Sequence, residues 1–283
     1  MPGGRTGEIP VPTVSGADEN RSKVRMGEGE NMSFAALSES LLTNLSFVIV
    51  CLVIVILVTA AAVVYERAVR RKNGGTERIL STRKIVVVGI FSAIATILFC
   101  LDFPVFFAPT FYKLDLSELP ALIAAFAYGP VAGVLIEFIK IVLKLFVKGT
   151  STAFVGELAN YAIGVSFLLP ASMIYQFRKT KKTAILACLA GTVCITVFGA
   201  IFNVVYLLPA FAALYGMPLD AIIGMGSKIN SSIRDLPTFA VFAVAPLNFV
   251  KGAMDSLITI LIYKKLSPIL KSEHGRTAGK AQD

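Results

Sequence analysis

Phe111-Tyr-Lys-Leu-Asp-Leu-Ser-Glu-Leu-Pro120 is a charged stretch between two long apolar segments. It carries Lys113, Asp115 and Glu118 beside aromatic side chains, and the apolar helix that follows stops at Tyr128-Gly-Pro130. Proline removes a backbone donor and disfavours a continuing helix before it, so this stop is a local feature of the sequence. A plain connection between helices needs none of this polar chemistry. We therefore expect the loop to contact a ligand.

The composition around this loop is that of a membrane protein. Hydrophobic residues make up 55% of the 283-residue chain, charged residues only 16%, and the mean hydropathy is +0.75. A soluble domain carries roughly 25% charged residues, so this chain has too little polar surface to cover a soluble fold. Several apolar runs approach the roughly 20 residues that a helix needs to cross a bilayer. The sequence predicts an all-α integral membrane protein.

Charge and the rarer side chains exclude several function classes. The net charge of +9 comes from basic clusters just outside apolar runs, which is the pattern of cytoplasmic loops and not of a nucleic-acid surface. The four cysteines lie in or beside apolar segments without metal-type spacing and are expected to be free thiols. The single histidine, His274, lies in a polar tail, which argues against a histidine-dependent catalytic or metal site. We expect no metal and no enzymatic activity.

The chain is expected to consist of a six-helix body with an N-terminal extension. Gly, Pro, Ser and mixed charges favour a flexible start, and a nearly unbroken aliphatic run with a basic cluster after it favours an added membrane anchor. The predicted segments are a flexible polar tail (1–42), an additional transmembrane helix (43–66), a basic cytoplasmic linker with Asn73-Gly74-Gly75 (67–82), a six-helix ligand-binding membrane domain (83–266) and a cytoplasmic C-terminal tail (267–283).

Three basic clusters place the N-terminus outside and the C-terminus in the cytoplasm. A single helix over Leu236–Tyr263 would be about 42 Å long, more than a ~30 Å membrane core. We therefore expect the last helix to begin near Pro246, which fits a first helical turn, after an outer loop over residues 209–236. The other expected body helices are Lys84–Leu101, Leu119–Tyr128, Val131–Val147, Ala153–Tyr175 and Thr183–Leu208.

By this topology, polar groups inside apolar segments gather in the outer half of the membrane domain. Asn248, Lys251 and Asp255 are spaced three and four residues apart and share one helix face. Asn203 and Asn160 lie near the outer ends of their helices. An ionisable group in hydrocarbon costs roughly 2.5–3.5 kcal/mol and usually faces a partner or a cavity. Together with the loop above them, these residues predict a pocket open to the outside.

Purely structural roles are open alternatives for these groups. A membrane asparagine often only bonds a neighbouring helix. Asp255 can satisfy Lys251 one turn away, and Ser117 before Leu119-Pro120 resembles an N-cap, with Asp115 and Glu118 serving the same helix start. Glu137, Lys140 and Lys144 lie along one face of a single helix, where a structural role is open. Lys144 and Lys148 are close enough to its outer end to extend toward the membrane surface.

Several motifs occur together in one known family. They are Lys113-Leu-Asp-Leu-Ser-Glu-Leu-Pro120, Tyr128-Gly-Pro130, Gly156-Glu-Leu-Ala-Asn160, Asn203 with Tyr206 and Pro209, and Pro246-Leu-Asn-Phe-Val-Lys251-Gly. With these motifs, residues 80–266 resemble the substrate-binding (S) component of energy-coupling factor (ECF) vitamin transporters, most closely the riboflavin-specific type. Residues 1–79, with the additional helix, lie outside the resemblance.

The resemblance implies that the chain captures riboflavin from outside, beneath its first outer loop, and delivers it inward. A transmembrane coupling subunit and two cytoplasmic ATPases are the implied partners, the bacterial plasma membrane is the implied location, and riboflavin is a transported ligand and not a cofactor. Gly89 and Ala93 match the family's docking surface for the coupling subunit, although the family usually has alanine at both positions. The implied ligand-binding residues are Asn203, Asn248, Lys251, Asn160 and Asp115.

The side-chain chemistry agrees with this implication, and three alternatives stay open. Asparagine pairs with donor and acceptor edges of a flavin, and no nucleotide-binding loop is present, so ATP hydrolysis is expected from partners.

The first alternative is the same fold with another vitamin or precursor. The second is a stand-alone secondary transporter with Lys140 and Glu137 as a proton relay. The third is a membrane enzyme acting on lipid or isoprenoid, with Asp115 and Glu118 as metal ligands. In the favoured interpretation, the charged loop before Pro120 closes over the bound ligand as a lid.

Overall fold

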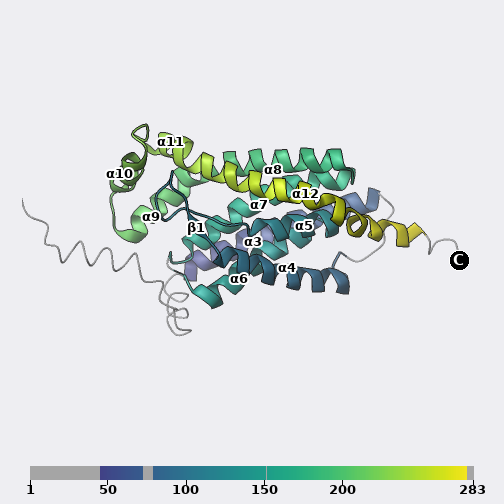
Figure 1. Ribbon diagram of the computed structural model, residues 1–283. Coiled ribbons are helices and arrows are strands. Elements are labelled where there is room, and N and C mark those ends of the chain that lie inside the picture. Colours follow the sequence, from purple (N-terminus) through teal and green to yellow (C-terminus); the bar gives the residue numbers. More distant parts are fainter. Residues whose placement is uncertain (1–44, 73–78, 151, 279–283) are drawn as a thin grey trace, which may run out of the picture. The chain divides into compact units, whose positions relative to one another are not determined.

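The computed structural model describes residues 45–72, 79–150 and 152–278 (Figure 1). The expected N-terminal tail, the Asn73-Gly74-Gly75 linker and the end of the C-terminal tail lie outside the described residues. The described chain is almost entirely helical. Its helices are α3 (Leu45–Lys72), α4 (Thr82–Cys100), α5 (Glu118–Tyr128), α6 (Pro130–Lys148), α7 (Val155–Phe177), α8 (Lys181–Phe202), α9 (Leu208–Tyr215), α10 (Leu219–Ile229), α11 (Leu236–Phe239) and α12 (Ala245–Ala278), with π-helical turns η1 (Asn203–Leu207) and η2 (Ala240–Val244).

Within the described residues, five helices are long and apolar enough to cross a membrane. They are α3, α4, α7, the helix from α8 through α9, and the helix from α11 into α12. The 19-residue α6 is as long as α4, but it carries charged residues, of which Glu137 and Lys140 are fully buried. The shorter apolar α5 completes the body. The prediction of an all-α membrane protein, with six body helices after one additional helix, is confirmed.

The additional helix α3 packs directly against the body, on α6 and α7. It continues to Lys72, past the end that the sequence indicated. The buried Glu66 carboxylate accepts hydrogen bonds from Lys84 Nζ at 2.8 Å and from the Val131 backbone N–H at 3.3 Å. The first N–H groups of a helix have no partner within it, and α6 starts at Pro130, so a carboxylate is well placed there. Helix α3 is therefore bonded to two body helices at this end.

The outer segment over residues 209–236 is mostly helical, so the prediction of a loop there is wrong. The turn η1 leads from α8 into α9 without a break, and α10 follows after Pro218. Pro209 is the second residue after η1. A π-helical turn offers a wider register in which a residue without a backbone donor fits, so proline does not end the helix.

The last membrane helix begins at Leu236 and not near Pro246, which corrects the prediction. Asp235 caps it by accepting from the Thr238 N–H at 2.8 Å in a capping box, and Pro237 occupies the first turn. The second π-helical turn, η2, ends two residues before Pro246. Pro209, after an expected helix end, and Pro246, at an expected helix start, therefore both follow a π-helical turn inside a longer helix.

The loop between α4 and α5, residues 102–117, is here called the lid loop. Its strands β1 (Phe103–Pro104) and β2 (Lys113–Leu114) form a short antiparallel pair in which Phe103 lies opposite Leu114. Tyr112 and Leu114 are buried in one apolar cluster with residues such as Phe239 of α11. The lid loop is thus packed against α11 and the neighbouring ends of the later helices.

Candidate functional site

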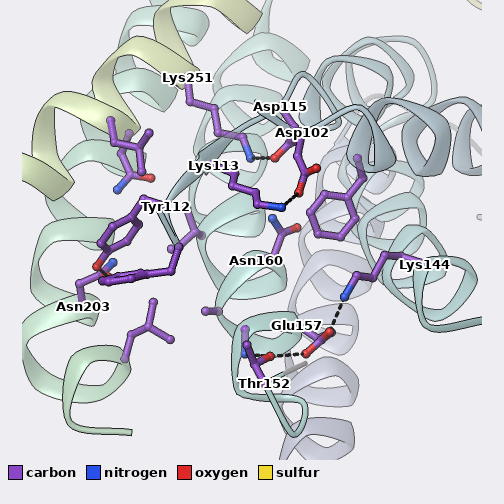
Figure 2. A pocket seen from close by; sticks show the side chains of 18 of the residues that line it. Asp102, Tyr112, Lys113, Asp115, Lys144, Thr152, Glu157, Asn160, Asn203 and Lys251 are labelled. Carbon is purple, nitrogen blue, oxygen red and sulfur yellow. Dashed lines mark hydrogen bonds and ion pairs between the residues drawn. The ribbon is translucent and has the colours of Figure 1, made fainter. Parts of the chain in front are cut away.

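A pocket of about 260 Å³ lies beneath the lid loop (Figure 2). All five side chains that were expected to bind ligand line it: Asn160 of α7, Asn203 of η1, Asn248 and Lys251 of α12, and Asp115 of the lid loop. The expected convergence of these residues is therefore present. That they bind a ligand stays a prediction.

Asn203 is engaged by the lid loop. The Tyr112 hydroxyl donates to Asn203 Oδ1, and Asn203 Nδ2 donates to the Gly199 carbonyl at 2.7 Å. Figure 2 shows Tyr112 and Asn203 together on one wall of the pocket. Burial raises the pKa of the Tyr112 phenol, which is therefore a neutral donor at physiological pH. An amide oxygen can accept two hydrogen bonds, so a ligand that uses this atom must either share it with Tyr112 or displace Tyr112.

Asn248 depends on a close approach between α8 and α12. A Cβ atom added to Gly199 would lie 2.5 Å from Asn248 Nδ2 and 2.8 Å from its Cγ. Asn248 Nδ2 donates to the Val244 carbonyl at 3.1 Å, in the π-helical turn η2. A glycine on α8 and a π-helical turn before α12 together place this amide at the pocket wall.

Asn160 has an unpaired acceptor. Its Oδ1 is buried and has no hydrogen-bond partner among the residues that the structure describes. Leaving a buried polar atom unpaired costs about 1–3 kcal/mol. Since Asn160 lines the pocket, a donor on a bound molecule is the simplest partner for this oxygen.

Lys251 pairs with the lid loop and α5, and the alternative in which Asp255 satisfies it is wrong. Its Nζ lies 2.9 Å from Asp115 Oδ2 and 2.8 Å from Glu118 Oε2. Burial by itself raises the pKa of Asp115, but the ammonium groups of Lys251 and Lys140 outweigh it and hold this pKa below its ordinary value. The ionised Asp115 connects the lid loop to the floor of the pocket.

Ser117 occupies the N-cap position of α5, as the sequence predicted, but its side chain does not cap the helix. Its side chain makes no capping hydrogen bond, and its Oγ instead accepts from Lys140 Nζ at 2.9 Å. The Ser117 N–H donates to Asp115 Oδ1 at 2.9 Å. A fully buried ammonium group needs acceptors more than a helix end does, which explains the exchange.

The opposite wall of the pocket holds a second ion pair. Glu157 pairs with Lys144 and also accepts from the hydroxyls of Thr150 at 3.1 Å and Thr152 at 2.9 Å (Figure 2). The Lys144 side chain is only 17% exposed. It therefore points into the protein, and its predicted extension toward the membrane surface is wrong.

Asp102 holds the two ends of the lid loop to α6. It lies 3.1 Å from Lys113 Nζ and 3.3 Å from Lys148 Nζ, and Lys148 also donates to the Cys100 carbonyl at 2.7 Å. These lysines are nearly half exposed, so each ion pair contributes little to stability. The contacts orient the lid loop without fixing it tightly.

Gly89 and Ala93 lie away from the pocket, on an exposed face of α4. A Cβ atom at Gly89 would meet nothing within 4 Å, and Ile90 and Ile97 on the same side are more than half exposed. This face is apolar and carries small side chains where another helix can approach. Its expected role in docking stays a prediction.

Sequence reasoning singled out Glu118 in the loop, but it did not predict three contacts that shape the pocket. Tyr112 occupies Asn203, Glu118 pairs with Lys251, and Gly199 makes room for Asn248. Tyr112 and Glu118 belong to the motif that opened the sequence analysis, where an aromatic next to a charged run was a usable signal. Gly199 gave no signal, because its role depends on a helix distant in sequence.

Residues 83–263 match the family model described as "ECF transporter, substrate-specific component". The chain belongs to this family. This S component is 32% identical over 195 residues to the riboflavin transporter FmnP of Bacillus subtilis (strain 168), covering 69% of this chain and 97% of that one. It is 35% identical over 190 residues to the riboflavin transporter RibU of Staphylococcus aureus (strain TCH60), covering 67% and 93%.

A solved structure of the S component of a bacterial ECF transporter has the same fold. It superposes with a TM-score of 0.51 at 31% identity, covering 67% of this chain and 98% of the other. The S component described here is therefore a multi-pass membrane protein, and its named relatives are transporters. As a substrate-specific component, it works together with other subunits of an ECF transporter.

Proposed function

We propose that this S component binds riboflavin from outside the cell and delivers it inward within an ATP-driven ECF importer. The observation that carries the proposal is the convergence of Asn160, Asn203, Asn248 and Lys251 on one pocket beneath the lid loop. The names of its relatives support the same vitamin. Riboflavin is then a transported ligand and not a resident cofactor.

The pocket chemistry suits a flavin. Riboflavin is a flat aromatic ring system with carbonyl oxygens, ring nitrogens and an imide N–H, and its ribityl chain carries hydroxyl groups. Asparagine amides both donate and accept, and Lys251 donates to carbonyls or hydroxyls. Phe111 and Tyr112 of the lid loop add aromatic area at the pocket. The unpaired Asn160 Oδ1 accepts from an N–H or a hydroxyl.

Binding requires a rearrangement of the lid loop. The pocket of about 260 Å³ is smaller than the roughly 300–1,000 Å³ of most ligand sites, and Tyr112 occupies Asn203 Oδ1. We infer that Tyr112 gives up this hydrogen bond when riboflavin enters. Asp115 then holds the lid loop to Lys251 and takes part in binding through that pair.

The proposal includes a docking face for partner subunits and an orientation of the chain in the membrane. The exposed face of α4 around Gly89 and Ala93 docks a transmembrane coupling subunit, and two cytoplasmic ATPases supply the energy that this chain has no nucleotide-binding loop to obtain. Basic clusters support an N-terminus outside and a C-terminus in the cytoplasm. The bacterial source of the named relatives supports the bacterial plasma membrane as the location. The chain itself catalyses no reaction.

One alternative conflicts with the contacts, and the other two are distinguished by experiment. A metal site at Asp115 and Glu118 would compete with Lys251, which lies within 2.9 Å of both carboxylates. A stand-alone secondary transporter predicts riboflavin uptake in liposomes that contain this chain alone. Another vitamin predicts that riboflavin leaves the protein's stability and fluorescence unchanged.

Removal of the Asn248 amide tests the assignment of the pocket. Asn248→Ala should weaken riboflavin binding about 5–150-fold, because one buried polar partner is worth about 1–3 kcal/mol. Titration of the purified protein, followed by quenching of riboflavin fluorescence, measures the change. Asn230→Ala is the matched control, because this asparagine does not line the pocket. Equal affinity of the Asn248 variant and the control would remove Asn248 from the site.

A further inference from the structure

Beneath the pocket lies a buried cluster of ionisable side chains from four segments. Asp115, Glu118 and Lys251 form one half, joined through the two ion pairs of Lys251. Lys140 continues the cluster into α6, with its Nζ 3.2 Å from Glu118 Oε1 and 2.6 Å from Glu137 Oε2. Asp255 lies one turn after Lys251 on α12. The six residues are each at most 6% exposed.

The charges of this cluster do not balance. It contains four carboxyl groups and two ammonium groups, so full ionisation would leave two uncompensated negative charges inside a membrane domain. Within the described part of the chain, Glu137 Oε1 and both oxygens of Asp255 have no hydrogen-bond partner. The Thr259 hydroxyl, one turn beyond Asp255, is also unpaired. Among the described residues, Asp255 therefore has no hydrogen-bond partner, and Glu137 has only the Lys140 ammonium, which it shares with Glu118. Both have fewer partners than a buried ionised carboxylate needs.

Among the described residues, neighbouring elements contribute no further ion pair to Glu137 and Asp255. On α7, Tyr161 and Gly164 face Glu137, and a Cβ atom at Gly164 would lie 2.6 Å from its Oε2. On α8, Cys188 and Thr192 are the groups near α12, and the Thr192 hydroxyl bonds Ser256 at 3.0 Å. Lys144, the next lysine on α6, is engaged by Glu157. The lid loop and α5 contribute the acids Asp115 and Glu118.

A proton fits this site better than a metal ion does. Among the described residues, no group of three or more acidic, histidine or cysteine side chains is arranged to hold a metal. A protonated carboxyl group loses its charge and gains a donor, which removes both the charge excess and part of the hydrogen-bond deficit.

We propose that this buried cluster binds protons at Glu137 and Asp255, and that riboflavin binding in the adjoining pocket is accompanied by proton uptake. The proton uptake on riboflavin binding rests on the proposed function, whereas the protonation of Glu137 and Asp255 does not. Lys251 provides the link, since it lines the pocket and also pairs with Asp115 and Glu118. A ligand acceptor that draws on the Lys251 ammonium leaves the acids with less positive charge. Displacement of water from the pocket raises the cost of an ionised carboxylate further.

Proton uptake makes the affinity for riboflavin depend on pH. A complex that binds more protons than the free protein is favoured at low pH, so the affinity for riboflavin falls as pH rises through the titration range of the cluster. For one proton taken up, the fall is about tenfold per pH unit within that range. Below and above the range the affinity is constant.

The experiment uses the full-length chain in detergent or nanodiscs. Riboflavin titrations across the pH range in which riboflavin itself does not ionise should show this fall. Calorimetry in two buffers of different ionisation enthalpy should show net proton uptake on binding. Infrared spectra should contain a protonated carboxyl band that shifts in D₂O. Glu137→Gln and Asp255→Asn, which imitate the protonated forms, should each diminish that band and the pH dependence, and the double variant should remove both.

Glu66→Gln is the control. The buried Glu66 carboxylate bonds the Lys84 ammonium and the Val131 N–H and does not belong to the charged cluster. This variant should therefore keep the pH dependence of riboflavin binding. Unchanged affinity across the pH range with no proton uptake would overturn the linkage while leaving riboflavin binding intact. Absence of the carboxyl band in both free and loaded protein would overturn the protonation itself. Failure of riboflavin to bind at any pH would instead refute the proposed function, and the infrared result would still decide the protonation.

Discussion

Gly199 is the residue whose replacement tests the pocket geometry most cleanly. In Gly199→Ala, the added methyl group would lie 2.5 Å from Asn248 Nδ2, so the amide must move away from its present position. We expect riboflavin affinity to fall about tenfold or more, because a misplaced buried amide costs about 1–3 kcal/mol. Fluorescence titration measures the effect.

Gly224→Ala provides the matched control for this variant. Gly224 also lies in a helix, α10, and a Cβ atom there would meet nothing within 4 Å. Its affinity for riboflavin should equal that of the parent chain. If both glycine variants bind equally well, Asn248 does not need its present position to bind the vitamin.

Tyr112 competes with the ligand for Asn203 in this account. Tyr112→Phe keeps the packed ring but removes the hydroxyl that donates to Asn203 Oδ1. One hydrogen bond contributes about 1 kcal/mol, so the closed lid loop should open more readily and riboflavin should associate about fivefold faster. Stopped-flow quenching measures this rate, and a slower association would contradict the role given to Tyr112.

At the scale of elements, the sequence predicted helices well and their interruptions poorly. The positions of α4 to α8 follow from apolar runs bounded by charges, glycines and prolines. A helix was expected to end before Pro209 and another to begin near Pro246, but each proline follows a π-helical turn inside a longer helix. Local sequence gives the propensity of proline to stop a helix. Whether a π-helical turn accommodates it depends on packing against other helices.

The candidate site shows the same division. The residue types of the pocket were predictable, because Asn160, Asn203 and Asn248 are polar groups in apolar segments. Their pairing was not, because Lys251 meets Asp115 across 136 positions of sequence and not Asp255 one turn away. Spacing along one helix identifies neighbours on that helix only. It carries no information about what a facing helix presents.

Helix α3 makes a testable contribution to the stability of the body. Glu66→Ala removes the carboxylate that bonds the nearly inaccessible Lys84 ammonium and the Val131 N–H. Breaking a buried ion pair costs about 3 kcal/mol, so the unfolding temperature in detergent should fall by several degrees. Arg71→Ala, at an exposed position of the same helix, is the control. Equal unfolding temperatures would mean that α3 does not brace the body through Glu66.

At the scale of the whole molecule, the membrane domain combines two polar layers in a largely apolar protein. The outer layer is the asparagine-lined pocket beneath the lid loop, and the layer below it is the charged cluster around Lys140. Lys251 belongs to both. Through Lys251, a ligand in the pocket can affect the buried charged cluster, which lies away from the exposed face of α4.

The most direct test of the central claim is a titration of the purified full-length chain with riboflavin. The account predicts quenching of flavin fluorescence that saturates at one riboflavin per chain with nanomolar affinity, and preparations from riboflavin-containing medium that are yellow. Asn248→Ala should shift the same curve to higher concentration. A well-folded chain that neither quenches riboflavin fluorescence nor retains the vitamin would contradict the account.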